Sequence, residues 1–174
     1  MTQKKQQPAG RATDPEVMEH RRLQFEAGEV RFRSRVREAV AARGLASFMN
    51  ATKWAELQAA VQDELPFAPA YQRQDLLEDP QAVPESDVGS WGGWWFGEFI
   101  EPIWSIEWLR IIPYRWEHVG ALVPPRLNAD CREPLKAILD RLSIPCRQDA
   151  RSIWVYGYAP AGPATLTGPG EGIT

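Results

Sequence analysis

The stretch SWGGWWFGEFIEPIWSIEWLRIIPYRW, residues 90–116, decides the fold because it holds six of the eight tryptophans in a chain of 174 residues. Aromatic and β-branched residues at this density are typical of strands. The runs 94–99 and 103–112 flank Glu101-Pro102, a pair that predicts a turn. We therefore expect an antiparallel hairpin over residues 94–112.

This hairpin has two different faces if Phe99 lies opposite Ile103. Strand alternation then places one set of large apolar residues in the core: Trp94, Phe96, Trp104, Ile106 and Trp108. Trp95 lies on the other, mixed face, and Trp91 precedes the two glycines, so both are candidates for recognition. Trp116, beyond Pro113, is assigned to neither face. A shift of one residue in the register would exchange the faces.

Three helices are predicted outside the hairpin. Asp14-Pro15-Glu16 is typical of a helix start and Gly44 of a stop, which predicts a helical arm over residues 14–44. A helix over 52–64 is capped by Asn50 or Thr52 and ended by Pro66. Another helix, over 132–142, carries apolar residues at spacings of three and four. Further strands are expected near 118–123 and 151–158, with residues 68–90 as a long connection containing one helical turn at 72–79.

The expected fold is therefore α+β, with a small, mainly antiparallel sheet covered on one face by the helices 52–64 and 132–142. Residues 1–13 and the tail 159–174 lack apolar periodicity and are expected to be disordered. The α+β domain is expected to occupy residues 49–158. No apolar run approaches the roughly 20 residues of a membrane helix, and no signal peptide is visible, so a cytoplasmic location is expected.

Charge is distributed unevenly along the chain. Residues 1–43 carry ten Lys or Arg against six Asp or Glu, and residues 44–174 carry ten against seventeen. A basic arm therefore precedes an acidic domain. The arm is interpreted as an amphipathic helix lying on the domain, with docking on an acidic or nucleic-acid partner as the alternative. The acidic charge argues against nucleic acid as a ligand of the main domain, because phosphate contacts need clustered Lys and Arg.

Several short motifs resemble a family of small uncharacterised bacterial cytosolic proteins. These are the opening MNATKWAEL, the strand WSIEWLRI, the helix end LSIPC and the closing SIWVYGY, which together span residues 49–158. The resemblance implies an α+β fold and no particular activity. The architecture also resembles that of bacterial immunity proteins, which bind a toxin. Because the family pattern begins at Met49, residues 1–48 are expected to be either an appended arm or the product of an upstream start codon.

The sequence contains no recognisable catalytic, cofactor or metal signature. Cys131 and Cys146 are expected to be free thiols, and with His20 and His118 they lack the close spacing of a zinc site. The pair Cys146 and His118 belongs to no local nucleophile motif. The glycine-rich stretches SWGGWW and GPGEG lack the strand-loop-helix context of a phosphate site. We expect no cofactor, no metal and no catalytic residue.

Two functions remain open. We favour a non-enzymatic interaction protein whose acidic surface meets a basic protein partner, and an immunity-like role is one form that this function could take. The candidate binding surface consists of Trp91, Trp95, Glu98, Glu101 and Glu107. The alternative is a small-ligand or glycan-binding protein, or a hydrolase, in which the same tryptophans line a pocket and two of these carboxylates flank a glycosidic bond. The oligomeric state is not decided by the sequence.

Overall fold

A computed structural model of the chain describes residues 15–79, 95, 102–117 and 126–160. Its compact units are Met1–Arg35 and Val36–Thr174, which we call the first unit and the second unit. The helices are α1 (Pro15–Ala42), α2 (Ala51–Glu64) and α3 (Arg132–Arg141), with a 3-10 helix, η3 (Ile103–Ser105). The strands are β1 (Leu45–Ser47), β2 (Ala70–Asp75), β3 (Ile106–Ile112), β4 (Tyr114–Glu117), β5 (Arg126–Asp130), β6 (Cys146–Gln148), β7 (Ile153–Tyr156) and β8 (Tyr158–Pro160).

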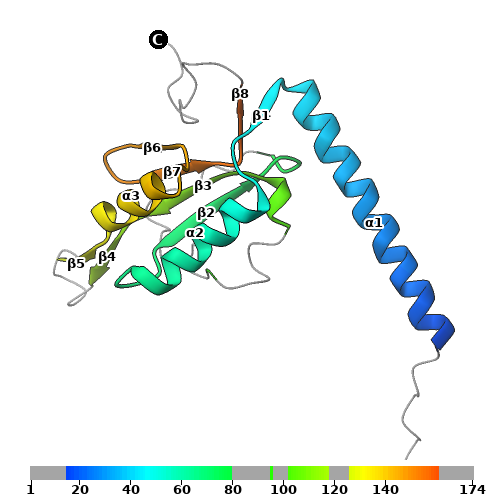
Figure 1. Cartoon of the computed structure of the whole chain (residues 1–174), viewed down its shortest axis with the longest axis horizontal. Coiled ribbons are helices and arrows are strands. Elements are labelled where there is room, and N and C mark those ends of the chain that lie inside the picture. Colours follow the sequence, from blue (N-terminus) through cyan, green and yellow to red (C-terminus); the bar gives the residue numbers. More distant parts are fainter. Residues whose placement is uncertain (1–14, 80–94, 96–101, 118–125, 161–174) are drawn as a thin grey trace, which may run out of the picture. The chain divides into compact units, whose positions relative to one another are not determined.

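The second unit is built on a four-stranded antiparallel sheet in the order β2-β3-β7-β6. Two-stranded ribbons, β1-β8 and β4-β5, complete the strand pairing of the described residues. Figure 1 shows α2 and α3 side by side over one face of the sheet. The expected α+β fold, with two helices on one face of an antiparallel sheet, is therefore confirmed.

Local signals place the helices where the sequence predicts them. The side chain of Asn50 caps α2 by accepting a hydrogen bond from the backbone N–H of Lys53 at 2.8 Å. Gly44 follows α1 with a φ of 61°, a left-handed conformation that glycine adopts without strain. The stripe of α3 is buried through Leu135, Ile138 and Leu139. Local periodicity and capping thus determine these helices.

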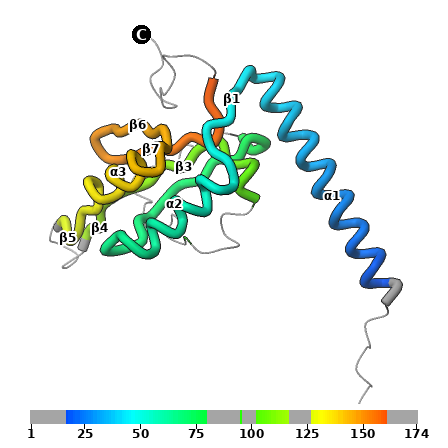
Figure 2. Tube along the Cα trace, in the orientation of Figure 1, coloured from blue at the N-terminus to red at the C-terminus, as the bar shows by residue number. Residues whose placement is uncertain are grey.

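The main core lies between the helices and the sheet. Ile153 and Val155 of β7 point into this core with Trp54 and Leu57 of α2. The alternate β7 residues, Trp154 and Tyr156, belong to a second cluster on the other side of the sheet, together with Trp108, Ala159 and the half-buried Phe48. The two faces of β7 thus alternate with the two-residue period of a strand. Figure 2 shows β1 beside the final described strand, β8, and the residue after β1 joins this second cluster.

The predicted hairpin is wrong in its pairing. The strand is confirmed as β3, but its Trp108 lies opposite Gln74 of β2 and Tyr156 of β7. Since neighbours occupy both edges of β3 at Trp108, Trp94 cannot pair there as expected. Trp94 and Phe96 lie outside the described residues. Trp104 was expected in a strand and in the core, but it is half-buried on η3.

Three further differences concern the short strands. The connection 68–90 contains β2 where a helical turn was expected, and that strand pairs along β3 from Ala70 to Asp75. Neither β1 nor β6 is predicted by the sequence, because each has only three residues. The strand expected at 118–123 lies outside the described residues. The strands that flank it in the sequence, β4 and β5, pair with each other.

Candidate functional site

The candidate site lies on the β4-β5 ribbon. Its register places Trp116 directly opposite Leu127, so that the two side chains share one face. Trp116 is 50% exposed and Leu127 is 47% exposed, which makes them the large exposed apolar residues of the described second unit. The ring of Tyr114 meets that of Trp116 edge to face, with centroids 5.8 Å apart and planes at 79°. Aromatic surface is therefore presented to solvent on a ribbon with fixed register.

Hydrogen bonds fix the walls around this aromatic face. Asp130, at the end of β5, accepts the backbone N–H of Arg132 at 2.8 Å and so orders the start of α3. The backbone N–H of Cys131 donates to the carbonyl oxygen of Pro113 at 2.7 Å, which ties that start to the entry of β4. On the other wall, Asp149 accepts the N–H groups of Arg151 at 2.8 Å and of Ser152 at 2.7 Å. The turn before β7 is thereby held in place.

Together these elements line an open groove of about 480 Å³. Its lining residues are Tyr114, Trp116, Leu127, Asp130, Arg132, Ala150 and Arg151. The guanidinium carbon of Arg132 lies 6.0 Å from the ring centroid of Tyr114, at the outer limit of a cation–π contact. Among the described residues, the lining thus holds two guanidinium groups against one carboxylate. The groove is suited to an apolar or aromatic group beside a negative charge.

The candidate surface expected from the sequence is not assembled in the described residues. Trp95 was expected to be exposed, and it is completely buried. Its indole N–H donates to the carbonyl oxygen of Pro69 at 2.8 Å, and its ring packs edge to face on Tyr71 with centroids 5.1 Å apart. The expectation of exposure is wrong because the residue finds apolar neighbours and a hydrogen-bond acceptor inside the core.

The acidic members of that surface are placed only in part. Glu107 lies on β3, where its carboxylate accepts hydrogen bonds from both terminal nitrogens of Arg43 in a bidentate ion pair. Its own backbone carbonyl accepts the N–H of Gly157 at 2.8 Å. Trp91, Glu98 and Glu101 lie outside the described residues. Among the described residues, Glu107 therefore serves to join the end of α1 to the sheet.

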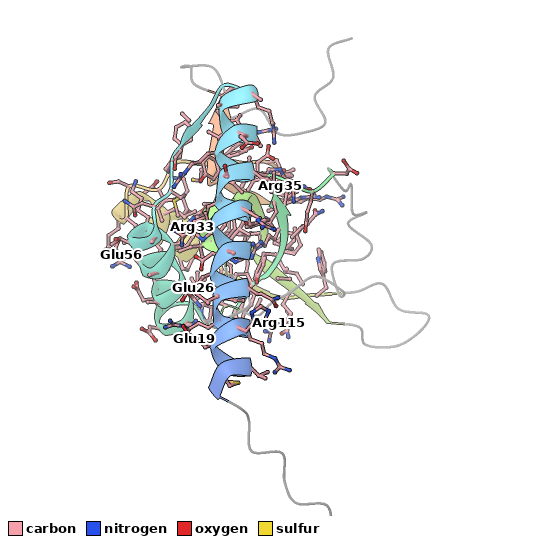
Figure 3. All side chains as sticks on the ribbon, turned by 90° about the vertical axis from the view of Figure 1, so that its right-hand side faces the viewer. Glu19, Glu26, Arg33, Arg35, Glu56 and Arg115 are labelled. Carbon is pink, nitrogen blue, oxygen red and sulfur yellow. The ribbon has the colours of Figure 1, made fainter. Side chains whose placement is uncertain are left out.

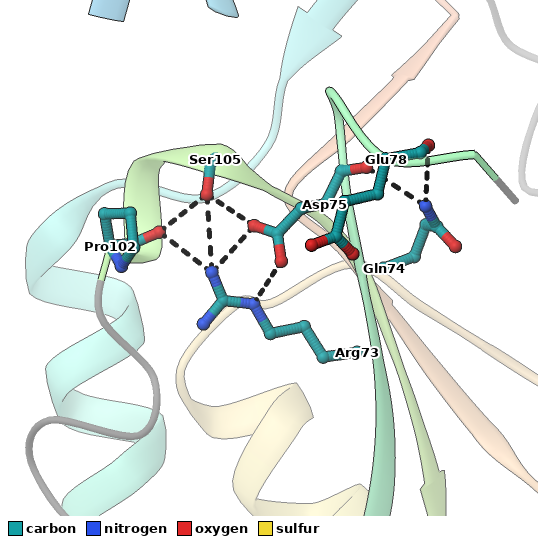
Figure 4. A network of polar contacts seen from close by, with 6 residues as sticks. All are labelled: Arg73, Gln74, Asp75, Glu78, Pro102 and Ser105. Carbon is teal, nitrogen blue, oxygen red and sulfur yellow. Dashed lines mark hydrogen bonds and ion pairs between the residues drawn. The ribbon is translucent and has the colours of Figure 1, made fainter. Parts of the chain in front are cut away.

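A polar network joins β2 to η3 at the edge of the main core (Figure 4). Arg73 donates to both carboxylate oxygens of Asp75, at 2.6 and 2.7 Å, and Asp75 also accepts the hydroxyl of Ser105. The Ser105 hydroxyl is buried and also lies 2.9 Å from the carbonyl oxygen of Pro102. No histidine takes part among the described residues, and the carboxylate that accepts this hydroxyl is paired with Arg73, so the network does not resemble an activated nucleophile. The network holds η3 against the bulge between Gln74 and Asp75.

The two cysteines are free, as expected, and chemically quiet. Burial raises the pKa of the Cys131 thiol to about 11, and the neighbouring carboxylate of Asp130 adds to this rise. Burial likewise raises the pKa of Cys146. The thiolate is the reactive form of cysteine, so neither residue is poised for nucleophilic chemistry at neutral pH.

The described residues offer neither a metal-binding cluster nor a membrane-spanning helix. They contain no cluster of three or more His, Cys, Asp or Glu side chains that could hold a metal ion. Likewise, no helix within the described part of the chain has the length and apolar character needed to span a membrane.

Sequence reasoning missed the groove, although one signal for it was present. Tyr114 and Trp116 alternate with Arg115, which is the period of a strand with an aromatic face. Leu127, Arg132 and Arg151 give no such signal, because each reaches the groove from a separate segment. Only the β4-β5 pairing and the position of α3 bring them together.

A comparison with known families places the chain. Residues 36–162 match the model of a family of unknown function, DUF6678. The chain belongs to this family. The match begins at Val36 rather than at Met49, which corrects the expectation that the family pattern starts at the MNATKW motif. Val36 is itself buried, and β1 pairs with β8 within the same match. No curated protein and no solved structure matches the chain.

Proposed function

We propose that this DUF6678 protein is a non-enzymatic cytoplasmic binding protein that holds a segment of a partner protein in the β4-β5 groove. The observation that carries the proposal is the half-exposed Trp116 packed beside Tyr114 and opposite Leu127. Tryptophan, tyrosine and arginine are the residues that most often dominate protein interfaces. Here all three types line one groove with a fixed backbone, which lowers the entropic cost of binding.

The charge of the groove favours an acidic partner segment. Arg132 and Arg151 stand against the single carboxylate of Asp130 among the lining residues. An acidic side chain beside an apolar one would therefore place its charge near the arginines and its apolar group on Trp116. The expectation of a basic partner rests on the acidic balance of residues 44–174 and on Glu98, Glu101 and Glu107, the first two of which are not described, and it stays a prediction. If the partner is a toxin, the role is the immunity-like one that the sequence suggests.

The volume of the groove supports a second candidate, a small-ligand binder. About 480 Å³ lies within the range of ordinary ligand pockets, about 300–1,000 Å³. Aromatic rings beside Asp130 and Arg151 could stack on a planar or sugar ring and fix its polar groups. Hydrolysis by paired carboxylates is not supported by the described part of this groove, where Asp130 is the one carboxylate in the lining.

Peptide selection on the full chain tests the proposal directly. A phage-displayed library of random twelve-residue peptides should yield sequences that combine Asp or Glu with a large apolar residue. The selected peptides should lose at least tenfold in affinity on Trp116→Ala, and several-fold on Arg132→Gln, as measured by fluorescence anisotropy. Binding should weaken as the salt concentration rises, because charged contacts at an exposed groove are screened.

A matched control is Arg141→Gln, which removes an exposed arginine of the same helix that forms an ion pair with Glu64 outside the groove. This variant should bind the selected peptides as the native chain does. Peptides rich in Lys or Arg, or binding that survives Trp116→Ala, would overturn the proposal. If the library yields nothing and small aromatic or sugar fragments quench Trp116 instead, the second candidate replaces it.

A further inference from the structure

The first unit exposes an unusual amount of apolar side chain. Seven large apolar residues are exposed in the described chain, and five of them lie on α1 within the first unit: Val17, Met18, Leu23, Phe25 and Val30. Phe25 is 75% exposed and Met18 is 51% exposed. Scattered apolar residues on a surface are ordinary, but a phenylalanine this exposed on a regular helix calls for a partner.

Two of these residues belong to a regular row. Met18 and Phe25 are seven residues apart, and the half-buried Phe32 continues the spacing, so the three side chains lie on nearly the same line along α1. Apolar residues at this spacing occupy one of the two heptad positions through which one helix packs against another. Leu23 and Val30 form a second, shorter row on the opposite side, so the helix is less amphipathic than the sequence suggests. The Met18 row is the longer of the two.

The charges beside the Met18 row follow a pattern along the helix. Helix geometry places Glu19, Arg22, Glu26, Glu29 and Arg33 along one side of this row. Three ion pairs within the helix confirm their proximity: Arg22 with Glu19 at 2.9 Å, Arg22 with Glu26 at 3.7 Å, and Arg33 with Glu29 at 2.6 Å. Figure 3 shows the labelled Glu19 and Glu26 in one half of α1, with Arg33 and Arg35 in the other half. The first half is therefore the more acidic and the second the more basic.

We infer that α1 pairs with α1 of a second copy of this chain, in an antiparallel arrangement centred on Phe25. Centring on Phe25 places Met18 of each copy against Phe32 of the other and Phe25 against Phe25. On the charged side, Glu19 then lies near Arg33 of the second copy, and Arg22 lies near Glu29. Opposite charges therefore meet at both ends of the seam, whereas Glu26 lies near Glu26 of the second copy and Glu19 lies near its Glu29 as like-charged contacts.

The charge balance favours a second copy over a membrane surface. Across Pro15–Ala42, five glutamates stand against six arginines. Helices that lie on anionic lipid need a polar face dominated by Lys or Arg. The acidic first half of α1 would be repelled by such a surface. In an antiparallel pair the same acids are neutralised by the basic half of the other copy.

Sedimentation equilibrium of the full chain tests the pairing. The apparent mass should rise from 19.7 kDa toward twice that value between about 1 and 200 µM, a range typical of modest helix pairing. Phe25→Glu should hold the chain at 19.7 kDa across this range. Its matched control, Gln24→Glu, adds the same charge one position away and off the row, and it should still associate. A native chain that stays monomeric throughout overturns the inference.

Charge exchange tests the antiparallel register. The double variants Glu19→Lys/Glu29→Lys and Arg22→Glu/Arg33→Glu should each be monomeric, because each places like charges opposite one another. Mixed in equal amounts, the two should recover the native association. If the mixture does not associate even at lowered salt, where opposite charges attract most strongly, the register is overturned.

Cross-linking in a Cys146→Ser background supplies a second measurement of register. Phe25→Cys should form a disulfide-linked dimer, whereas Met18→Cys should link only when mixed with Phe32→Cys. Efficient linkage of Met18→Cys to itself would instead mean a parallel pair and overturn the model. All eight tryptophans lie at or beyond Trp54, so their fluorescence should stay unchanged in these variants and report an intact second unit. The result is independent of the groove, since no residue exchanged here contributes to it.

Discussion

The indole N–H of Trp95 donates to the carbonyl oxygen of Pro69 at 2.8 Å, across 26 positions of sequence. The backbone carbonyl of the same tryptophan accepts hydrogen bonds from the side-chain amides of Gln58, at 2.7 Å, and Gln62. Both glutamines project from α2, one turn apart. Trp95 is thus joined through its side chain to the segment before β2 and through its backbone to a helix, and its ring fills the core between them.

Replacing Trp95 should destabilise the second unit strongly. Trp95→Ala removes a completely buried indole and should cost about 3–5 kcal/mol, because the cavity adds to the lost transfer free energy. Trp95→Phe keeps part of the ring and loses the bond to Pro69, so we expect an intermediate loss. Urea unfolding followed by circular dichroism measures both. Trp116→Ala is the exposed counterpart, and a loss as large as that of Trp95→Ala would contradict this account.

Gly157 and Gly28 should respond in opposite directions to alanine. A Cβ at Gly157 would overlap the carbonyl oxygen of Ile106, which is backbone and cannot move aside cheaply. Gly157→Ala should therefore lower the melting temperature by many degrees, consistent with a loss of several kcal/mol. Gly28 lies in α1, and nothing lies within 4 Å of a Cβ built there. Alanine at this position should stabilise the helix by about 1 kcal/mol and so raise the helix content. Thermal melts and far-ultraviolet circular dichroism distinguish the two, and a tolerant Gly157 would contradict the packing described.

Asp149 should make stability dependent on pH in the acid range. Burial alone raises the pKa of Asp149. Hydrogen bonds from the indole N–H of Trp154 and the N–H groups of Arg151 and Ser152 together lower the pKa by more than burial raises it, so the net shift is downward. A lowered pKa in the folded state stabilises the protein above the unfolded value, near 4. That stabilisation is lost as the pH falls from about 4 through the folded pKa. Unfolding free energies of native and Asp149→Asn chains should therefore differ at pH 7 and converge toward pH 2, and a constant gap would refute the role.

The thiols should differ in their reaction with a disulfide reagent. Cys131 is completely buried with a pKa of about 11, so less than one per cent is thiolate at pH 8 and access is blocked as well. Cys146 is half-buried with a raised pKa, and it should react slowly in the folded chain. Native protein should thus release about one equivalent of thionitrobenzoate, and unfolded protein two. Rapid release of two equivalents from the folded chain would show that Cys131 is not enclosed.

The sequence predicts the parts of the fold that local physics controls. The cap at Asn50, the stop at Gly44 and the apolar stripe of α3 are short-range signals, and the structure has each helix within about two residues of its expected bounds. The alternation of Ile153 and Trp154 between two clusters is equally local. Each of these follows from bond geometry and side-chain spacing within one segment.

Pairing and burial in the tryptophan-rich stretch were decided only by tertiary structure. The sequence identifies the β3 strand, but β2 and β7 are distant along the chain, and no local rule selects them as its neighbours. For the same reason the sequence assigns Trp95 to the surface and leaves Trp116 unassigned, whereas the fold buries the first and exposes the second. The sequence by itself determined the three helices and the strands β3 and β7, since these depend on neighbours along the chain. Which tryptophan meets solvent was decided by contacts between segments far apart, because burial depends on what packs against a face rather than on the face alone.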